Sequence, residues 1–113
     1  MNKDLLFPAT LMPDQDWWHE LWPDPTQVLT DIGIENGMDV VDLCCGDGYF
    51  TRPMCALSIS GNVYALDLDK ELLDKAKIAC SAYDNLIAIS ADARELPQQI
   101  PGVVDLVFIA NTF

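Results

Sequence analysis

The sequence predicts an α/β fold in which short parallel strands alternate with helices. Three observations predict it: short apolar runs recur along the chain, segments with helical apolar spacing separate them, and several runs end at or just before an aspartate. This alternation is typical of a parallel sheet with helices packed against it. Because the connections between parallel strands are right-handed, we expect the strand order 3-2-1-4.

The chain begins with residues 1–37, which we expect to form a helical arm ahead of the main domain, residues 38–113. A short helix in the second half of this arm has clear boundary signals. Asp24 suits the N-cap position, Pro25 suits the first helical position, and Gly33 marks the stop.

The first half of the arm is rich in tryptophan. Trp18, Leu21 and Trp22 share one helical face because they are three and four residues apart. The tryptophans, Trp17 included, either pack on the sheet or line the substrate side, and His19 is either solvated or a general base. The sequence leaves both pairs of alternatives open.

The main domain should contain four strands and two helices. The expected strands are residues 39–44, 62–66, 86–90 and 104–110, and the expected helices are residues 49–58 and 69–82. The turn signal Gly61-Asn62 precedes the second strand, and Asp69 suits the N-cap of the second helix.

The most informative stretch is residues 40–48, Val-Val-Asp-Leu-Cys-Cys-Gly-Asp-Gly, an apolar run that turns into an acidic loop with spaced glycines. This pattern indicates a buried strand that brings a nucleotide-like cofactor to the start of a helix, where backbone N–H groups are unpaired. A dinucleotide fingerprint would need glycine where Cys44 and Tyr49 stand. Asp42 and Asp47 would also repel a diphosphate. The loop therefore favours S-adenosylmethionine, which has a positive centre and no phosphate, over NAD.

Two further aspartates lie at expected strand ends. Asp67 ends the second apolar run, 19 positions beyond Gly48, where a carboxylate usually accepts ribose hydroxyls. We therefore expect loss of Asp67 to weaken cofactor binding and to leave the stability of the empty protein nearly unchanged. Asp92 follows the third run and either takes the adenine amino group or caps the turn after it.

At this point the chain resembles the class I S-adenosylmethionine-dependent methyltransferases, most closely the small-molecule branch that includes ubiquinone and menaquinone biosynthesis enzymes. Residues 41–48 resemble its motif I, V-L-D-x-G-x-G-x-G, with Cys44 where a glycine is common. Residues 63–69, 90–97 and 104–111 resemble the ribose-binding strand end, the adenine-side turn and the fourth strand. The resemblance runs from about Met38 to Phe113 and implies a Rossmann-like fold.

The resemblance also implies an enzyme that transfers a methyl group from S-adenosylmethionine to a small molecule. Because such an enzyme mainly positions two reactants, we assign no catalytic side chain. The expected cofactor-binding residues are Asp42, Cys44, Gly46, Gly48, Asp67, Leu68, Asp92, Ala93 and Asn111.

The amino-acid composition limits the classes of substrate and partner that we expect. The chain has 18 acidic and 6 basic residues, a net charge of −12, which disfavours a nucleic-acid substrate. No apolar run approaches the roughly 20 residues that cross a bilayer. The four cysteines form no C-x-x-C pair, so we expect buried thiols, no metal site and a cytoplasmic protein.

The end of the sequence raises a difficulty, because the family continues with three more strands. Residues 104–110 would then form an apolar sheet edge, which tends to pair with other chains. We expect either that the sequence is the N-terminal part of a longer protein or that a partner covers this edge, for example in a homodimer. The alternative function is a non-catalytic S-adenosylmethionine-binding or interaction module formed by a half-domain.

Overall fold

The computed structural model describes residues 23–43, 45–92, 100 and 102–109, and its four strands form one parallel sheet. The strands are β1 (Val40–Leu43), β2 (Val63–Asp67), β3 (Leu86–Ser90) and β4 (Leu106–Ile109), and the helices are α2 (Pro25–Asp31), α3 (Thr51–Leu57) and α4 (Lys70–Ala79). The strand order is β3-β2-β1-β4, which confirms the predicted 3-2-1-4 order.

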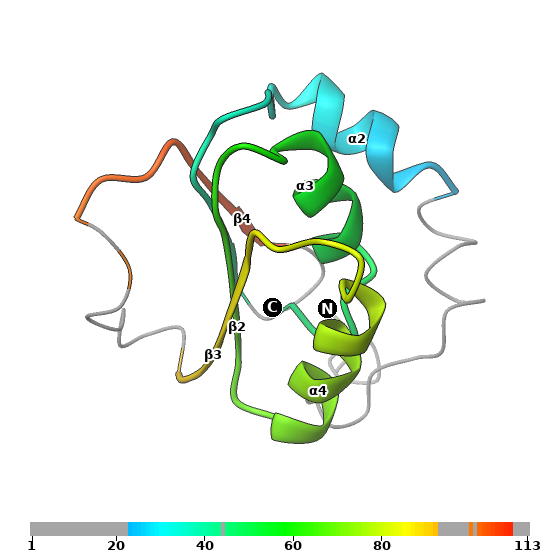
Figure 1. Cartoon of the computed structure of the whole chain (residues 1–113), viewed down its shortest axis with the longest axis vertical. Helices are drawn as coiled ribbons and strands as arrows, with labels where there is room; N and C mark the ends of the chain where they lie inside the picture. Colours follow the sequence, from blue (N-terminus) through cyan, green and yellow to red (C-terminus); the bar gives the residue numbers. More distant parts are fainter. Residues whose placement is uncertain (1–22, 44, 93–99, 101, 110–113) are drawn as a thin grey trace, which may run out of the picture.

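The three helices lie together along one face of the sheet (Figure 1). The core on that face joins Leu29 of α2 and Met54 of α3 to Val40 and Val63 of the two central strands. The part of the expected arm that the structure describes therefore packs into the same core as the sheet.

The opposite face of the sheet carries a second cluster, formed by Val41, Tyr64, Leu66 and Ile89. Ile100 and Val104, from the connection between β3 and β4, pack against it. The alternation follows from strand geometry, because successive side chains point to opposite faces.

Local sequence signals place the helix starts. The Asp24 side chain accepts a hydrogen bond from the Gln27 N–H at 3.0 Å, and Pro25 occupies the first turn of α2. Asp69 caps α4 by accepting from the N–H groups of Glu71 and Leu72. These two predicted caps are confirmed, and both helices of the main domain are shorter than expected, because α3 begins at Thr51 and α4 ends at Ala79.

The amino ends of the strands are tied together by acidic and amide side chains. The Asp39 N–H donates to the Asp105 carboxylate at 2.8 Å, and the Asp105 N–H donates to the Asp39 carbonyl at 2.8 Å. The Asn62 N–H donates to the Asp39 carboxylate at 3.1 Å. These bonds set β2 and β4 on either side of β1.

Candidate functional site

The loop after β1, described over residues 45–50, lies at the carboxyl ends of the strands. The order of the sheet reverses at β1, since the chain adds β2 and β3 on one side and then β4 on the other. In open α/β sheets, ligands bind outside the carboxyl ends of the strands at such a switch point. The loop that the sequence singled out is therefore at the position where a cofactor is expected.

Two backbone groups of the loop are bound to the end of β2. The Cys45 N–H donates to the Leu66 carbonyl at 2.9 Å, and the Gly46 N–H donates to the Asp67 carboxylate at 2.9 Å. Gly46 has a φ of +59°, a left-handed conformation that suits glycine. The structure thus brings two predicted site residues, Gly46 and Asp67, into direct contact.

Asp67 is only 3% exposed and uses both oxygens within the protein. Its second oxygen accepts a hydrogen bond from the Asp69 N–H at 2.9 Å. Asp67 therefore holds the loop and the start of the next turn before any ligand arrives. Because of these bonds, we now expect loss of Asp67 to lower the stability of the empty protein as well as its affinity for the cofactor.

Gly48 is required by packing against α4. Its φ is +95°, and an added Cβ would lie 3.0 Å from the Ala76 Cα and 3.2 Å from the Ala76 Cβ. A side chain at this position would be strained and would push the helix away. Gly48 was expected as a cofactor-binding residue, and the structure adds a close approach to helix α4 at the same position.

Asp42 is enclosed between β1 and the start of α3. It is 3% exposed, and its carboxylate accepts a hydrogen bond from the Thr51 hydroxyl at 2.7 Å. Burial raises the pKa of Asp42 from 3.8 to about 7, while the Thr51 bond lowers it and the charge of Asp67 raises it further. Near neutral pH this carboxyl is therefore partly protonated.

Thr51 was not predicted as a site residue. It lies nine positions after Asp42, at the first position of α3, and is fully buried. A hydroxyl residue just after a glycine loop was the only signal in the sequence.

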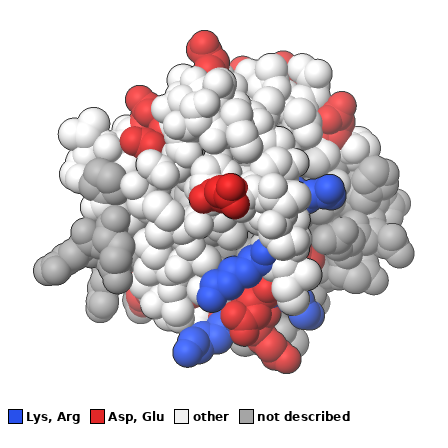
Figure 2. Space-filling model, in the orientation of Figure 1, with Lys and Arg blue, Asp and Glu red and all other residues white. Residues whose placement is uncertain are grey.

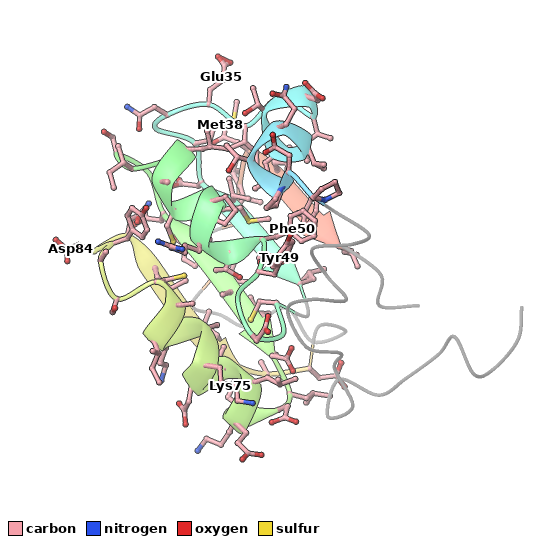
Figure 3. The ribbon with its side chains drawn as sticks, turned by 90° about the vertical axis from the view of Figure 1, so that its right-hand side faces the viewer. Glu35, Met38, Tyr49, Phe50, Lys75 and Asp84 are labelled. Atoms are coloured by element: carbon pink, nitrogen blue, oxygen red, sulfur yellow. The ribbon has the colours of Figure 1, made fainter. Side chains whose placement is uncertain are left out.

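Aromatic packing fixes the far end of the loop. Phe50 is buried, and its ring lies 4.9 Å from that of Phe108 in β4 and 5.5 Å from that of Tyr49. Figure 3 shows Tyr49 and Phe50 next to each other where the loop enters α3. The loop is thus held at β2, at α4 and at β4.

The remaining predicted site residues are either partly exposed at the ends of β2 and β3 or lie outside the residues that the structure describes. Leu68, directly after Asp67, is 67% exposed, and Asp92, just beyond β3, is half-buried. The residues outside the described part are Cys44, Ala93 and Asn111 of the expected site and Trp17, Trp18, His19 and Trp22 of the arm.

A hollow of about 440 Å³ lies on the helical face, beside the loop and not at the carboxyl edge. Gly48 and Tyr49 line it together with Arg52 of α3 and Tyr83 after α4. Figure 2 shows that Lys and Arg side chains are few on this face and gather mostly low on the molecule, over α4, among acidic ones. Neither Asp42 nor Asp67 is among the residues that line this hollow.

Comparison with known proteins decides the family. Residues 40–113 match the family model described as a methyltransferase domain. The chain belongs to the methyltransferase-domain family. This confirms the family resemblance and the Rossmann-like fold inferred from motif I and the strand-end aspartates.

The similar proteins agree with this membership. Over 80 residues the chain is 31% identical to a demethylmenaquinone methyltransferase of Staphylococcus aureus, an alignment that covers 70% of this chain and 32% of the relative. The chain thus spans about a third of the length of the curated relatives it matches.

Solved structures give the same result. A SAM-dependent methyltransferase from Aquifex aeolicus superposes with a TM-score of 0.67 at 28% identity, covering 76% of this chain and 47% of that one. A phosphoethanolamine N-methyltransferase from Haemonchus contortus, in complex with phosphoethanolamine and S-adenosylhomocysteine, superposes with a TM-score of 0.65 at 26% identity, covering 75% and 18%.

Two negative findings apply to the described residues only. Among them, no three His, Cys, Asp or Glu side chains gather in a way that could hold a metal ion. None of the described helices has the length and apolar character needed to cross a bilayer.

Proposed function

We propose that this chain binds S-adenosylmethionine at the carboxyl edge of the sheet and supplies the cofactor site of an enzyme that methylates a small molecule. The observation that carries the proposal is the Asp67 carboxylate, which is bonded to Gly46 of the glycine loop at the switch point of the sheet. Membership of the methyltransferase-domain family supports it.

Asp67 has acceptor capacity left for a ribose. An ionised carboxylate offers about four lone-pair sites, and the two backbone N–H groups use two of them. The exposed side chain of Leu68 follows directly and suits one face of the adenine. Asp92 beyond β3 suits the adenine amino group, and Gly46, Gly48 and Asp42 shape the loop beneath.

Cys44, Ala93 and Asn111 complete the proposed site on the strength of their sequence positions. The reaction itself needs little from the protein. The acceptor forms a bond to the methyl carbon while the carbon–sulfur bond breaks, so holding the two reactants in line supplies much of the catalysis. We therefore assign no catalytic side chain.

The proposed substrate is a small molecule. The net charge of −12 is unsuited to gripping a nucleic-acid backbone, and the Staphylococcus aureus relative is named for a small-molecule reaction. The described cysteines, Cys45, Cys55 and Cys80, are buried thiols outside any disulfide, which suits the cytoplasmic location that forms part of this proposal.

A second candidate is a non-catalytic binding or interaction module. It is favoured by edge strand β4, where Val107 is 51% and Ile109 is 41% exposed, so that a partner or a second copy could pair with this edge. Methyl transfer by the protein separates the two candidates, since both bind the cofactor and only the enzyme turns it over.

Calorimetric titration with S-adenosylhomocysteine and with NAD tests the proposed cofactor. We expect the chain to bind S-adenosylhomocysteine and to bind NAD more weakly, because the acidic loop has no phosphate cradle. Tighter binding of NAD would overturn the proposal.

A further inference from the structure

A side-chain hydrogen bond joins the two ends of the glycine loop, strand β1 and helix α3. The Thr51 hydroxyl, at the start of α3, donates to the Asp42 carboxylate of β1 at 2.7 Å, and both side chains are buried. The bond spans nine positions, with the loop between them. It is therefore the link that joins the strand before the loop to the helix after it.

Two buried carboxylates lie on the two sides of this loop. Asp42 lies at its base, and Asp67 of β2 holds the Gly46 N–H. The titratable group whose charge acts on Asp42 is Asp67, and the charge of Asp42 in turn acts on the thiols of Cys55 on α3 and Cys80 at the end of α4. From β4 the residue in register with Asp42 is Phe108, which carries no charge. Within the described residues, neither carboxylate has a Lys or Arg in ion-pair contact.

We propose that Thr51 is a positioning residue whose hydroxyl keeps Asp42 ionised and oriented, so that the pair of buried carboxylates favours the positive centre of the cofactor. The proposal rests on the proposed function. A hydrogen-bond donor stabilises the charged form of a carboxylate, whereas burial opposes it. Loss of the Thr51 donor therefore shifts the protonation equilibrium of Asp42 toward the neutral carboxylic acid.

Two substitutions of Thr51 distinguish the effect of its hydroxyl from the effect of its packing. Thr51→Val keeps the volume and the branched shape and removes only the donor, whereas Thr51→Ser keeps the donor. Thr30→Val is the matched control, because the Thr30 hydroxyl donates to the Thr26 carbonyl on the exposed helix α2, away from the loop.

The probes are S-adenosylmethionine and 5′-methylthioadenosine, titrated calorimetrically between pH 6 and pH 8. The second probe keeps the adenosine and the sulfur but lacks the sulfonium and ammonium charges. We expect Thr51→Val to weaken binding of S-adenosylmethionine roughly tenfold at pH 7, the usual scale for a hydrogen bond to a charged group, and that of 5′-methylthioadenosine less than twofold. Thr51→Ser and Thr30→Val should match the wild type.

The pH dependence of the affinity distinguishes the proposed role of Thr51 from loop packing, because a change in packing alone would not alter this dependence. Affinity for S-adenosylmethionine should rise with pH as Asp42 ionises, and in Thr51→Val this rise should move to higher pH. Each variant is compared with the wild type at the same pH, because the amine of the ligand titrates in the same range.

Three outcomes decide the matter. An equal loss for both probes, with an unchanged pH profile, would show that Thr51 only stabilises the loop and would overturn the inference. A wild type that binds neither probe would overturn the proposed function, and this is read from the wild type alone. If Thr51→Val does not fold, Asp42→Asn replaces it, and an unchanged preference for S-adenosylmethionine over 5′-methylthioadenosine in that variant would overturn the inference equally.

Discussion

The two ends of strand β1 both carry aspartates, and these aspartates lie in different surroundings. At the amino end, Asp39 and Asp105 bind backbone N–H groups where water still reaches them. At the carboxyl end, Asp67 accepts from backbone N–H groups and Asp42 accepts from the Thr51 hydroxyl, and each is only 3% exposed. Burial of a charged group is costly, so it persists where function requires it. This contrast supports our proposal that the cofactor binds at the carboxyl end.

Of the substitutions considered at the two ends of β1, replacement of Asp67 should have the largest effect on stability and cofactor affinity. In Asp67→Ala the N–H groups of Gly46 and Asp69 lose their acceptor, so the empty protein should lose about 2–4 kcal/mol of unfolding free energy, and cofactor affinity should fall by a further ~1.5–3 kcal/mol. Urea unfolding and calorimetric titration measure the two effects separately.

Asp105→Ala is the matched control at the amino end. It removes the acceptor of the Asp39 N–H from an exposed carboxylate and should cost about 1 kcal/mol or less with no change in cofactor affinity. Equal effects of the two substitutions on stability and binding would remove the distinction between the two ends.

Gly48 tests how tightly the loop is held against α4. Gly48→Ala should lose about 2–4 kcal/mol, because the new Cβ combines a φ of +95° with a 3.0 Å contact to the Ala76 Cα. Gly37→Ala has a similar φ of +91° with nothing within 4 Å, so it should lose only the conformational part, about 1 kcal/mol. Thermal or urea unfolding of the pair measures the contact by difference, and equal losses would mean that α4 yields freely.

Asp42 gives the carboxyl end a pH dependence of its own. Its pKa is raised from 3.8 to about 7 in the folded protein, so its contribution to stability is fully present below pH 4 and is lost as the pH rises toward 7. Asp42→Asn lacks this titration. We expect the unfolding free energy of the variant to match that of the wild type near pH 4 and to exceed it above pH 7 by on the order of 4 kcal/mol in urea unfolding. A difference that stays constant over this range would show that Asp42 is not protonated on burial.

The fold was predictable because its signals are local. The apolar runs of the strands, the caps Asp24 and Asp69 and the handedness of the crossovers are each read within a few residues or from a general rule. The boundaries were less accurate, since α3 begins two residues later than expected and α4 ends three residues earlier.

The sequence suggested residues for the site, whereas the hydrogen bonds among them became visible only in the structure. The Asp42–Thr51 and Gly46–Asp67 bonds join residues nine and 21 positions apart, and such pairs form only when the crossover brings strand and loop together. For the same reason the contact of Gly48 with α4 was not foreseen, because Ala76 lies on a helix that the sequence does not place against it. Tertiary contacts therefore decided what each predicted residue does.

The smallest expected change in stability concerns edge strand β4. Here the two edge strands of the sheet, β4 and β3, are compared. Val107 of β4 is 51% exposed, and we expect the isolated chain to associate through this edge. Val107→Lys should weaken the association and change unfolding free energy by no more than about 0.5 kcal/mol, as for most exposed substitutions. Ile87→Lys on β3, the opposite edge, is the matched control and should leave association unchanged. Light scattering coupled to size exclusion, over a range of concentrations, measures both variants. A wild type that stays monomeric at every concentration would contradict pairing through β4, and dissociation by Ile87→Lys alone would assign the pairing to the other edge.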